Sequence, residues 1–266
     1  MKITDILALP SMPMASPSYP RGPYRFLNRE YLIITYESDP DAIRAQLPEP
    51  LEPDGSNTVL YEFIKMPDSS GFGSYTESGI VIPAMFDGEK VNFTSQMYLD
   101  IESPISGGRE IWGFPKKLAQ PTLNVCEDTL TGTLYYAGES VAMGTMRYKQ
   151  EQITYDLKGE TVCTSCVDTL TKKMGKTQVN LKLIPDVDGT PAIAQLVSYN
   201  MTDIDIKGAW SGPARLHLVP HVNAPVADLP VRNVIGAMHF IANMTLPYGR
   251  VLHDYLKTPQ KEKKIA

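Results

Sequence analysis

The chain has 266 residues, of which 42% are hydrophobic and 21% are charged, and such values are ordinary for a folded domain. Its formal net charge is −5 and no stripe of Lys and Arg stands out, so we expect no nucleic acid as its partner. No apolar run approaches the ~20 residues that cross a bilayer. The short apolar segment at the start is interrupted by Asp5, so it would make a poor signal peptide. We therefore expect a cytoplasmic protein with no membrane partner, folded as one domain over residues 1–266.

The first part of the chain predicts an extended arm followed by one helix. Residues 1–25 are rich in proline, and we expect them to run extended over the surface or across a neighbouring subunit. In the stretch SDPDAIRAQLPEP, Asp39 is a suitable N-cap and Pro40 a suitable first helical residue. The helix must end by Leu47, because Pro48 follows and a residue before proline avoids the helical region.

Most of the remaining chain predicts strands, because β-branched and aromatic residues gather in short segments that end at turn residues. These segments are 30–38, 58–66 and 91–102, with predicted hairpins over 129–149, around Ala137-Gly138, and over 178–201, around Asp188-Gly189. The segment 232–244 fits either a helix with an apolar face or a buried strand. Many strands and few short helices predict a mainly β (β-rich α+β) fold. Its antiparallel sheet would pack on itself or close into a barrel with an apolar interior.

Three cysteines and four histidines give no recognisable metal site. Cys163 and Cys166 form one C-x-x-C pair, but a zinc or redox site usually needs a second pair or histidines at ligand spacing. His217 and His221 have i, i+4 spacing, but Pro220 between them breaks any helix that could align them. We expect reduced thiols and no bound metal, and whether Cys163 and Cys166 ever pair is left open.

The segment EIWGFPKKLAQP, residues 110–121, places two adjacent lysines in an apolar run, although lysine is seldom buried. Side chains on a strand alternate between its faces, and Phe114 is expected to be extended because a proline follows it. Lys116 and Lys117 would then point in opposite directions, and one of them could face the interior beside Phe114. The alternative is an edge strand on which both ammonium groups stay in water.

An interior lysine would carry chemistry, because only a neutral amine attacks a carbonyl group. The pKa of lysine in water is about 10.4, so only about 0.04% of the amine is neutral at pH 7. Burial can lower this pKa by as much as about 3–5 units. We expect desolvation to cause most of any such shift, since alternation holds the neighbouring ammonium away.

Beyond the lysine pair, segments in order along nearly the whole chain resemble the acetoacetate decarboxylase family. They are SPSYPRGPYRFLNREY (16–31), YTESG (75–79), MYLDIE (97–102), GRE (108–110), FPKKL (114–118), DTLTGTL (128–134), LKLIPDVDGTPAIAQL (181–196) and AWSGPARL (209–216). The resemblance implies a cone-like β-barrel with an apolar interior that assembles into a homo-oligomer, a dodecamer being one such assembly. It also implies decarboxylation of acetoacetate, a β-keto acid, to acetone and CO2, with no metal and no organic cofactor.

By motif position, the resemblance implies that Lys116 forms the Schiff base, that Lys117 lowers its pKa, and that Arg29, Glu62 and Glu77 lie near the reacting centre. Arg29 would either bind the substrate carboxylate or hold Glu77 in place. We favour the second role, because tight ground-state binding of the carboxylate slows its loss. Glu77 would either repel the substrate carboxylate or, if protonated, donate a proton to the enamine, whereas Glu62 is expected near the mouth as a proton relay or gate.

Met97 and Phe114 are the residues that we expect to line the substrate pocket. Some family members carry tyrosine where this chain has Phe114, so a hydroxyl group at that position is missing here. Two other functions remain open from the sequence. One is a Schiff-base aldolase or dehydratase of the same superfamily, which forms the enamine without losing CO2. The other is a barrel that only binds small apolar ligands.

Overall fold

The computed structural model describes residues 1–153, 170–172 and 174–257, and this part of the chain is mainly β with few short helices. The helical elements include α1 (Ile3–Leu7), α2 (Pro40–Gln46), α3 (Glu102–Gly107), the π-helical turn η1 (Gly108–Trp112) and the 3-10 turn η2 (Val226–Asp228), and residues 170–172 and 174 are also helical. None of the described helices is long and apolar enough to cross a membrane.

The described strands form a large sheet and a small one. The large sheet follows the order β10 (Glu151–Gln152), β13 (Thr202–Gly212), β15 (Asn233–Leu246), β1 (Tyr24–Glu37), β3 (Thr58–Ser69), β4 (Gly73–Phe86), β5 (Glu89–Leu99), β11 (Gln178–Pro185), β12 (Pro191–Tyr199), β16 (Arg250–Asp254), with β2 (Glu52–Pro53) paired to β4 and β6 (Lys116–Leu118) paired to β5. The small sheet follows the order β14 (Ala214–Leu218), β9 (Glu139–Arg147), β8 (Thr129–Tyr136), β7 (Gln120–Cys126). Pairing is antiparallel except that β5 runs parallel to both β6 and β11.

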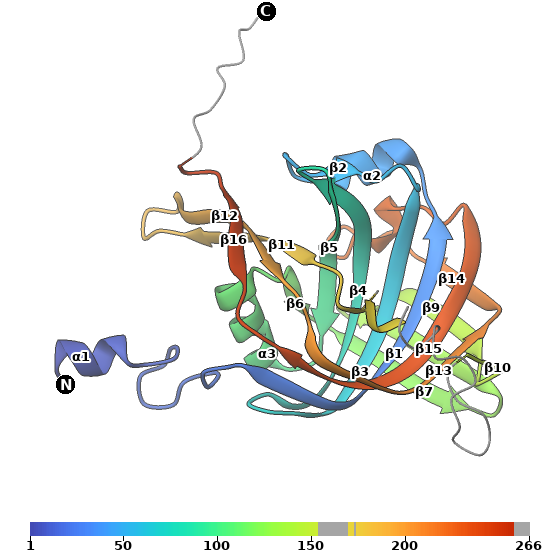
Figure 1. Ribbon diagram of the computed structural model, residues 1–266, viewed down its shortest axis with the longest axis horizontal. Helices are drawn as coiled ribbons and strands as arrows, with labels where there is room; N and C mark the ends of the chain where they lie inside the picture. The colour runs from blue at the N-terminus through green and yellow to red at the C-terminus, as the bar shows by residue number, and fades with distance from the viewer. Residues whose placement is uncertain (154–169, 173, 258–266) are drawn as a thin grey trace, which may run out of the picture.

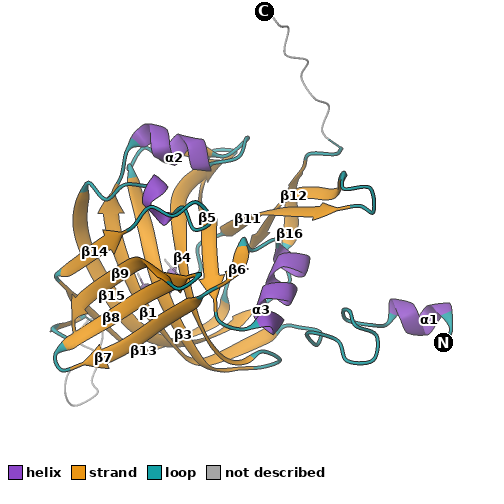
Figure 2. Ribbon diagram, turned by 180° about the vertical axis from the view of Figure 1, so that it is seen from behind, coloured by secondary structure: helices purple, strands orange, loops and turns teal. Residues whose placement is uncertain are grey.

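The large sheet is strongly curled, and the small sheet lies across the outside of β1, β3 and β4 (Figures 1 and 2). The two end strands of the large sheet, β10 and β16, are not paired with each other in the described part of the chain. The predicted antiparallel sheet is therefore present, whereas its closure into a barrel is not confirmed and stays a prediction.

Alternation of side chains gives the large sheet two buried faces. On β1, Leu32 and Ile34 point towards the small sheet and join the core between the two sheets. Phe63 of β3 lies in the same core, where Gly132 of β8 comes so close that an added Cβ would be 2.2 Å from the Phe63 ring. Glycine at this position lets the small sheet approach the large one closely. The opposite face of the large sheet lines the cavity described below.

Several predicted elements are confirmed. The predicted helix is α2, whose N-cap residue Asp39 has extended backbone and whose C-cap residue is Leu47. The Asp39 carboxylate does not cap the helix through its side chain and instead accepts two hydrogen bonds from Arg232. Segments 30–38 and 58–66 lie within β1 and β3, except for Ser38, and the two predicted hairpins are β8–β9 and β11–β12.

The structure also corrects one boundary, decides one open alternative and adds a strand. The segment 91–102 stays a strand only to Leu99, and α3 begins at Glu102. The segment 232–244, which fitted a helix or a strand, is the strand β15. Strand β4 was not predicted. Its sequence contains Gly79 and Pro83, which are both depleted in strands.

The N-terminal segment is only partly as expected. Residues before Tyr24 are mostly irregular, but Ile3–Leu7 form the helix α1 rather than extended chain. The α1 end of this arm stands away from the two sheets (Figure 1), and none of the α1 residues is buried, whereas Tyr19 is buried and its hydroxyl donates a hydrogen bond to Glu110 of η1. Cys163 and Cys166 lie outside the described residues, and Cys126 is a free, exposed thiol.

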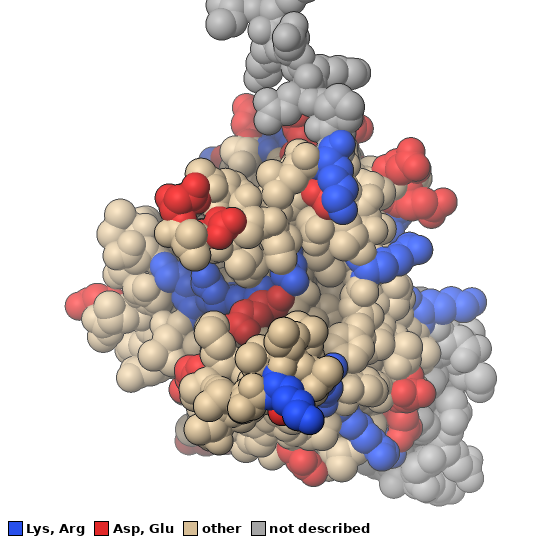
Figure 3. Space-filling model, turned by 90° about the vertical axis from the view of Figure 1, so that its left-hand side faces the viewer, with Lys and Arg blue, Asp and Glu red and all other residues tan. Residues whose placement is uncertain are grey.

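Charged side chains of both signs are spread over the outer surface. On the face in Figure 3, Lys and Arg lie interspersed with Asp and Glu. Exposed ion pairs include Arg232–Asp39 at 2.6 Å and Lys207–Asp205 at 2.5 Å. Such pairs contribute about 0–1 kcal/mol each, so we attribute the stability of the fold mainly to apolar packing on the two faces of the large sheet.

Candidate active site

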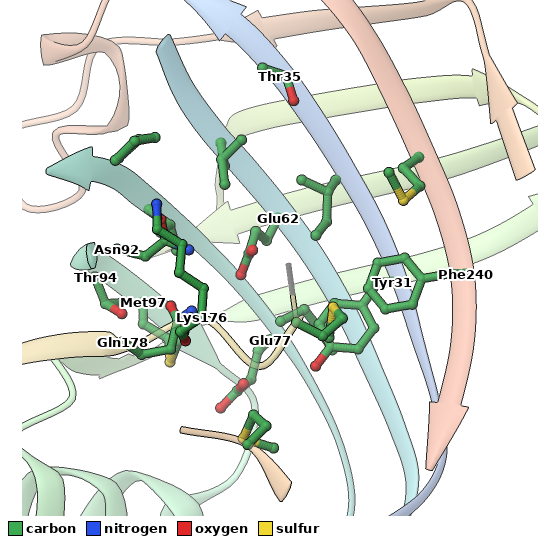
Figure 4. Close-up of a pocket in the computed structure, with 18 of the residues that line it drawn as sticks. Tyr31, Thr35, Glu62, Glu77, Asn92, Thr94, Met97, Lys176, Gln178 and Phe240 are labelled. Carbon is green, nitrogen blue, oxygen red and sulfur yellow. Dashed lines mark hydrogen bonds between the residues drawn. The ribbon is translucent and has the colours of Figure 1, made fainter. Parts of the chain in front are cut away.

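The inner face of the large sheet lines a cavity of about 620 Å³ (Figure 4). Its walls come mostly from β1, β3, β4, β5 and β15, and most of the side chains that line it are apolar. The alternation of strands brings charged residues from distant parts of the chain into this interior. The charged residues that line its inner part are Arg29, Glu62, Glu77 and Lys116.

Lys116 lies on β6, where it pairs with Met97 of the parallel strand β5. Lys116 is only 5% exposed to solvent. The turn η1 packs directly against its side chain, since a Cβ added to Gly108 would lie 2.7 Å from Cδ and 3.2 Å from Nζ of Lys116. Gly113 then takes a left-handed conformation, φ 75°, which turns the chain from η1 towards the strand. The packing of η1 against Lys116 thus directs the lysine side chain into the cavity.

The amine of Lys116 meets one carboxylate and two aromatic rings. Its Nζ lies 2.7 Å from Oε1 of Glu77, a residue that is 2% exposed. The same Nζ lies 4.9 Å from the centre of the Phe114 ring and 5.9 Å from that of Tyr75. The lysine therefore sits in a largely dehydrated wall with a single carboxylate partner.

The pKa of the Lys116 amine is lowered from its ordinary value of 10.5. Burial is the largest cause, and the positive charge of Arg29 adds to it. The nearby Glu77 carboxylate opposes the shift through its charge and its hydrogen bond, because both favour the ammonium form. Desolvation outweighs this attraction, so a larger fraction of the amine is neutral than in water.

Arg29 holds the other side of the carboxylate. One of its terminal nitrogens lies 3.7 Å from Oε2 of Glu77, and its guanidinium carbon lies over the rings of Phe26 and Tyr31, 4.9 and 4.8 Å from their centres. Met244 contacts the guanidinium from β15, with its sulfur 3.8 Å from one terminal nitrogen. Contacts with two rings and with Met244 restrict the orientation of Arg29, which suits a group that positions Glu77.

Glu62 faces the cavity from β3, one strand away from Glu77 on β4 (Figure 4). It is half-buried. Burial raises the pKa of the Glu62 carboxyl to about 7, and the negative charge of Glu77 adds to the effect while Arg29 opposes it. Near neutral pH this carboxyl group can therefore both give and take a proton.

The structure separates the two adjacent lysines. Lys117 does not line the cavity; its amine donates a hydrogen bond to the backbone oxygen of Asn223 and lies 4.9 Å from the centre of the Tyr136 ring. Met97 and Phe114, by contrast, both line the cavity next to Lys116. The structure thus gathers the predicted site residues except Lys117.

Three tyrosines of the cavity wall were not predicted from the sequence: Tyr31, Tyr75 and Tyr199. Two of them could have been found, because Tyr31 lies two residues after Arg29 and Tyr75 two residues before Glu77, so strand alternation places them on the same face. Tyr199 comes from β12, and its ring contacts Phe114 with 5.1 Å between the ring centres. No local pattern near Lys116 indicated that contact.

In the described ranges, no three His, Cys, Asp or Glu side chains are grouped in a way that could hold a metal ion. The site is instead a buried amine with two carboxyl groups and one guanidinium group in an otherwise mostly apolar wall. Such a set can form an imine with a ketone and move a proton beside it.

Comparison with known proteins identifies the family. The family model described as acetoacetate decarboxylase (ADC) matches residues 11–256. An acetoacetate decarboxylase from Paraburkholderia xenovorans is 55% identical over 250 residues, which cover 94% of this chain and 94% of that protein. These matches confirm the resemblance that the sequence motifs indicated.

Solved structures give the same result. The crystal structure of acetoacetate decarboxylase from Legionella pneumophila has a TM-score of 0.86 and 46% identity, covering 96% of this chain and 97% of that one. A second structure, from structural studies of acetoacetate decarboxylase, has a TM-score of 0.89 and 42% identity, covering 97% of this chain and all of that one (100%). With a matching sequence model, fold and relatives over nearly its full length, the chain belongs to the acetoacetate decarboxylase family.

Proposed function

We propose that this chain decarboxylates acetoacetate to acetone and CO2 through a Schiff base at Lys116. The observation that carries the proposal is the environment of the Lys116 amine, which is buried in the cavity wall with a lowered pKa. Relatives that are 55% and 53% identical to the chain are named acetoacetate decarboxylase, which supports the substrate. A neutral lysine is the group that this reaction requires at neutral pH.

The reaction begins when the neutral amine attacks the ketone carbon of acetoacetate. A C–N bond forms, the ketone oxygen leaves as water, and a cationic iminium results. The bond between the methylene carbon and the carboxylate then breaks, and its electron pair moves to the iminium nitrogen while CO2 departs. Protonation of the resulting enamine on carbon and hydrolysis release acetone and the free amine. The iminium nitrogen accepts the electron pair, so these steps call for neither a metal nor an organic cofactor.

Glu77 is placed to disfavour the substrate carboxylate. Its carboxylate lies 2.7 Å from the reacting nitrogen, so a substrate carboxylate brought to the same place meets a like charge. Departure of the substrate group as neutral CO2 relieves this repulsion. Arg29, at 3.7 Å, keeps Glu77 in position rather than clamping the substrate.

Glu62 is our candidate for the proton that the enamine carbon takes up. It faces the cavity at the level of Met97, the residue paired with Lys116, and its pKa of about 7 leaves a large protonated fraction at neutral pH. Lys117 has no direct part in these steps, since its amine is bonded to Asn223 outside the cavity. Met97 and Phe114 supply apolar contacts to the substrate.

The same proposal includes a single domain whose curled sheet acts as a cone-like barrel, and a cytoplasmic homo-oligomer, for which a dodecamer is one option. The support for assembly is the N-terminal arm, on which Ile3, Ile6 and Leu7 are exposed apolar side chains. Exposed apolar groups on a projecting arm favour burial against another copy. Light scattering of the purified chain tests this: a mass of several chains is expected, and a monomer would contradict it.

Borohydride reduction in the presence of acetoacetate tests the proposed function. The wild-type chain should gain the mass of one reduced adduct on Lys116 and should release CO2 without borohydride. Lys116→Ala should lose both signals, while Lys117→Ala serves as the matched control and should keep both. Thermal unfolding establishes that each variant is folded.

The outcomes separate the proposal from the other functions that the sequence left open. An adduct on Lys116 without CO2 release would indicate an aldolase or dehydratase. An unchanged protein mass would indicate a cavity that only binds ligands. Full activity of folded Lys116→Ala would end the proposed mechanism.

A further inference from the structure

The cavity is much larger than the substrate that we propose for it. Its volume is about 620 Å³. Acetoacetate has four carbons and three oxygens, and at the ~30 Å³ that one water molecule occupies in the liquid it would fill roughly 200 Å³. Most of the cavity therefore lies beyond the atoms that react.

The register of the strands shows where this extra space lies. Lys116 pairs with Met97, which lies opposite Gly79, which in turn lies opposite Glu62 and then Ile33. We call this row of five residues the reaction level. The side chains of Met97, Glu62 and Ile33 all line the cavity.

A second row, formed by Thr94, Val81, Leu60 and Thr35, lies two residues further along β1, β3 and β4 and, because of a β-bulge, three residues further along β5. We call it the tail level. All four side chains line the cavity, and none of them is charged. In Figure 4, Glu77, Glu62 and Thr35 mark three successive heights along neighbouring strands, with Thr35 farthest from Glu77.

A third row forms the rim. Asn92 of β5 lies opposite Pro83 and is paired with Gln178 of β11. The Lys176 amine donates a hydrogen bond to the Asn92 side chain at 2.9 Å. The rim is thus polar, whereas the tail level below it is uncharged.

The two ends of the cavity differ in exposure. At the rim, Ser56 and Lys90 line the cavity and are exposed. At the opposite end, Tyr31, Tyr75 and Phe240 are 4%, 5% and 0% exposed. Among the described residues, the rim is therefore the open end towards which a substrate can extend from the reaction level.

Apolar side chains along this path leave part of their surface exposed to the cavity. Ile33, Leu60 and Met238 line the cavity, and all three are only half-buried, unlike the core residues on the other face of the same strands. Apolar surface that faces a cavity gains free energy when an apolar group covers it. These side chains offer such a surface to a substrate chain.

We infer that the cavity binds 3-oxo acids with an alkyl chain running from Lys116 past Val81 and Leu60 towards the rim. Medium-chain 3-oxo acids are then better substrates than acetoacetate. The inference rests on the proposed function, because it uses the same iminium at Lys116 and the same loss of CO2. The carboxylate side of the ketone stays beside Glu77, and the other side carries the alkyl chain.

The register also gives the length of this chain. From Gly79 at the reaction level to Pro83 at the rim is four residues, or about 13 Å at 3.3 Å per residue. An extended chain covers about 1.2 Å per bond, as three backbone bonds per ~3.6 Å show. The alkyl chain of 3-oxooctanoate, five bonds beyond the ketone carbon, would reach about 6 Å and end near the tail level.

Turnover of a series of 3-oxo acids tests the inference. CO2 release is measured for acetoacetate, 3-oxohexanoate and 3-oxooctanoate, with the uncatalysed loss subtracted. Each buried methylene strengthens binding by up to about fourfold, so kcat/KM should rise along the series, by at most about 200-fold over four methylenes. A kcat/KM for 3-oxooctanoate at or below that for acetoacetate would overturn the inference. Failure with all three acids would instead refute the proposed function.

A narrower tail level supplies the second arm of the test. Leu60→Phe should lower the ratio of kcat/KM for 3-oxooctanoate to that for acetoacetate at least tenfold, because the larger ring occupies the path of the chain. Leu183→Phe, at an exposed position of β11, is the matched control and should keep the wild-type ratio. If Leu60→Phe does not fold, Val81→Leu narrows the same level with a smaller change. An unchanged ratio in the folded narrowing variant would show that the chain does not follow this path.

Discussion

At the scale of single residues, the site depends on a competition at one nitrogen. Glu77 at 2.7 Å favours the ammonium form of Lys116, whereas burial and the charge of Arg29 favour the neutral amine. The effect of burial is the largest, so the pKa of Lys116 is lowered. The charge of the adjacent Lys117 is not among the causes of this shift, and its amine bonds to the backbone oxygen of Asn223 outside the cavity.

Glu62 gives a prediction at the same scale. Its pKa is raised to about 7, so its protonated form is present below this pH and is lost as the pH rises through it. If Glu62 donates the proton, kcat/KM should fall above pH ~7, and Glu62→Gln should remove this alkaline limb and lower the maximal rate by about 10²-fold or more. The pH profile of CO2 release checks this. An unaltered alkaline limb in folded Glu62→Gln would exclude the role.

The same carboxyl group also links folding to pH. A folded-state pKa above the ordinary 4.5 means that the folded protein binds more protons than the unfolded chain between pH ~4.5 and ~7. Glu62 therefore lowers the free energy of unfolding as the pH rises through this window. The exposed Glu139 offers the matched control, since Glu139→Gln should leave both the pH profile and this stability trend as in the wild type.

The residues of the site were predictable to different degrees. Strand alternation around the lysine pair indicated that one lysine could face the interior beside Phe114. The choice of Lys116, together with Arg29, Glu62 and Glu77, came from the family motifs. Gly108 was not predicted as part of the site, because its contact with the Lys116 side chain depends on how η1 packs on β6. Packing between elements of this kind has no period in the sequence.

At the scale of elements, the turn η1 and the short strand β6 together position the Lys116 amine. The backbone oxygen of Gly108 accepts a hydrogen bond from the Phe114 N–H at 3.1 Å, and Arg109 donates one to the Lys116 backbone oxygen, also at 3.1 Å. Both contacts tie the turn to the strand that carries the lysine. The position of the amine is therefore set by η1 as much as by β6.

The substitution Gly108→Ala tests whether η1 positions the Lys116 amine. Gly108 has a helical backbone, φ −63°, so alanine fits its conformation, but the added Cβ would meet Lys116 at 2.7 Å. The lysine must shift, and a misplacement of about 1 Å can cost on the order of 10²-fold in rate. We expect kcat for acetoacetate to fall at least tenfold, measured as CO2 release in a variant that unfolds cooperatively.

The control for this substitution is Gly212→Ala. There the nearest atom to an added Cβ is the flexible end of Met146, at 3.3 Å, and Gly212 does not line the cavity. Its kcat should stay close to that of the wild type. A Gly108→Ala enzyme as fast as Gly212→Ala would show that η1 does not position the lysine.

The elements also show what sequence patterns can predict. Strands rich in β-branched and aromatic residues, such as β1 and β3, were found, and so were the hairpins with glycine in their turns. Strand β4 was missed, although it carries Glu77, because Gly79 and Pro83 interrupt its pattern. The order of the strands and the position of the small sheet follow from long-range pairing, which no local pattern contains.

At the scale of the whole molecule, the curled sheet supplies the dry wall on which the chemistry depends. The reacting groups lie at the closed end of the cavity, where Tyr31, Tyr75 and Phe240 exclude water, while the rim is open and polar. Burial that lowers the pKa of the Lys116 amine costs folding free energy, because the charged form loses its hydration. Packing over the rest of the two sheets has to offset such a cost.

The pKa of Lys116 in the folded protein is the most direct test of this account. It can be measured from the pH dependence of acylation of Lys116 by a small amine-reactive probe, read by mass spectrometry of the labelled peptide, in the wild type and in Lys117→Gln. We expect a midpoint well below 10.5 in both proteins, because burial rather than the neighbouring charge lowers it. A midpoint near 10.5 in the wild type, or a return to that value in Lys117→Gln, would contradict the central claim.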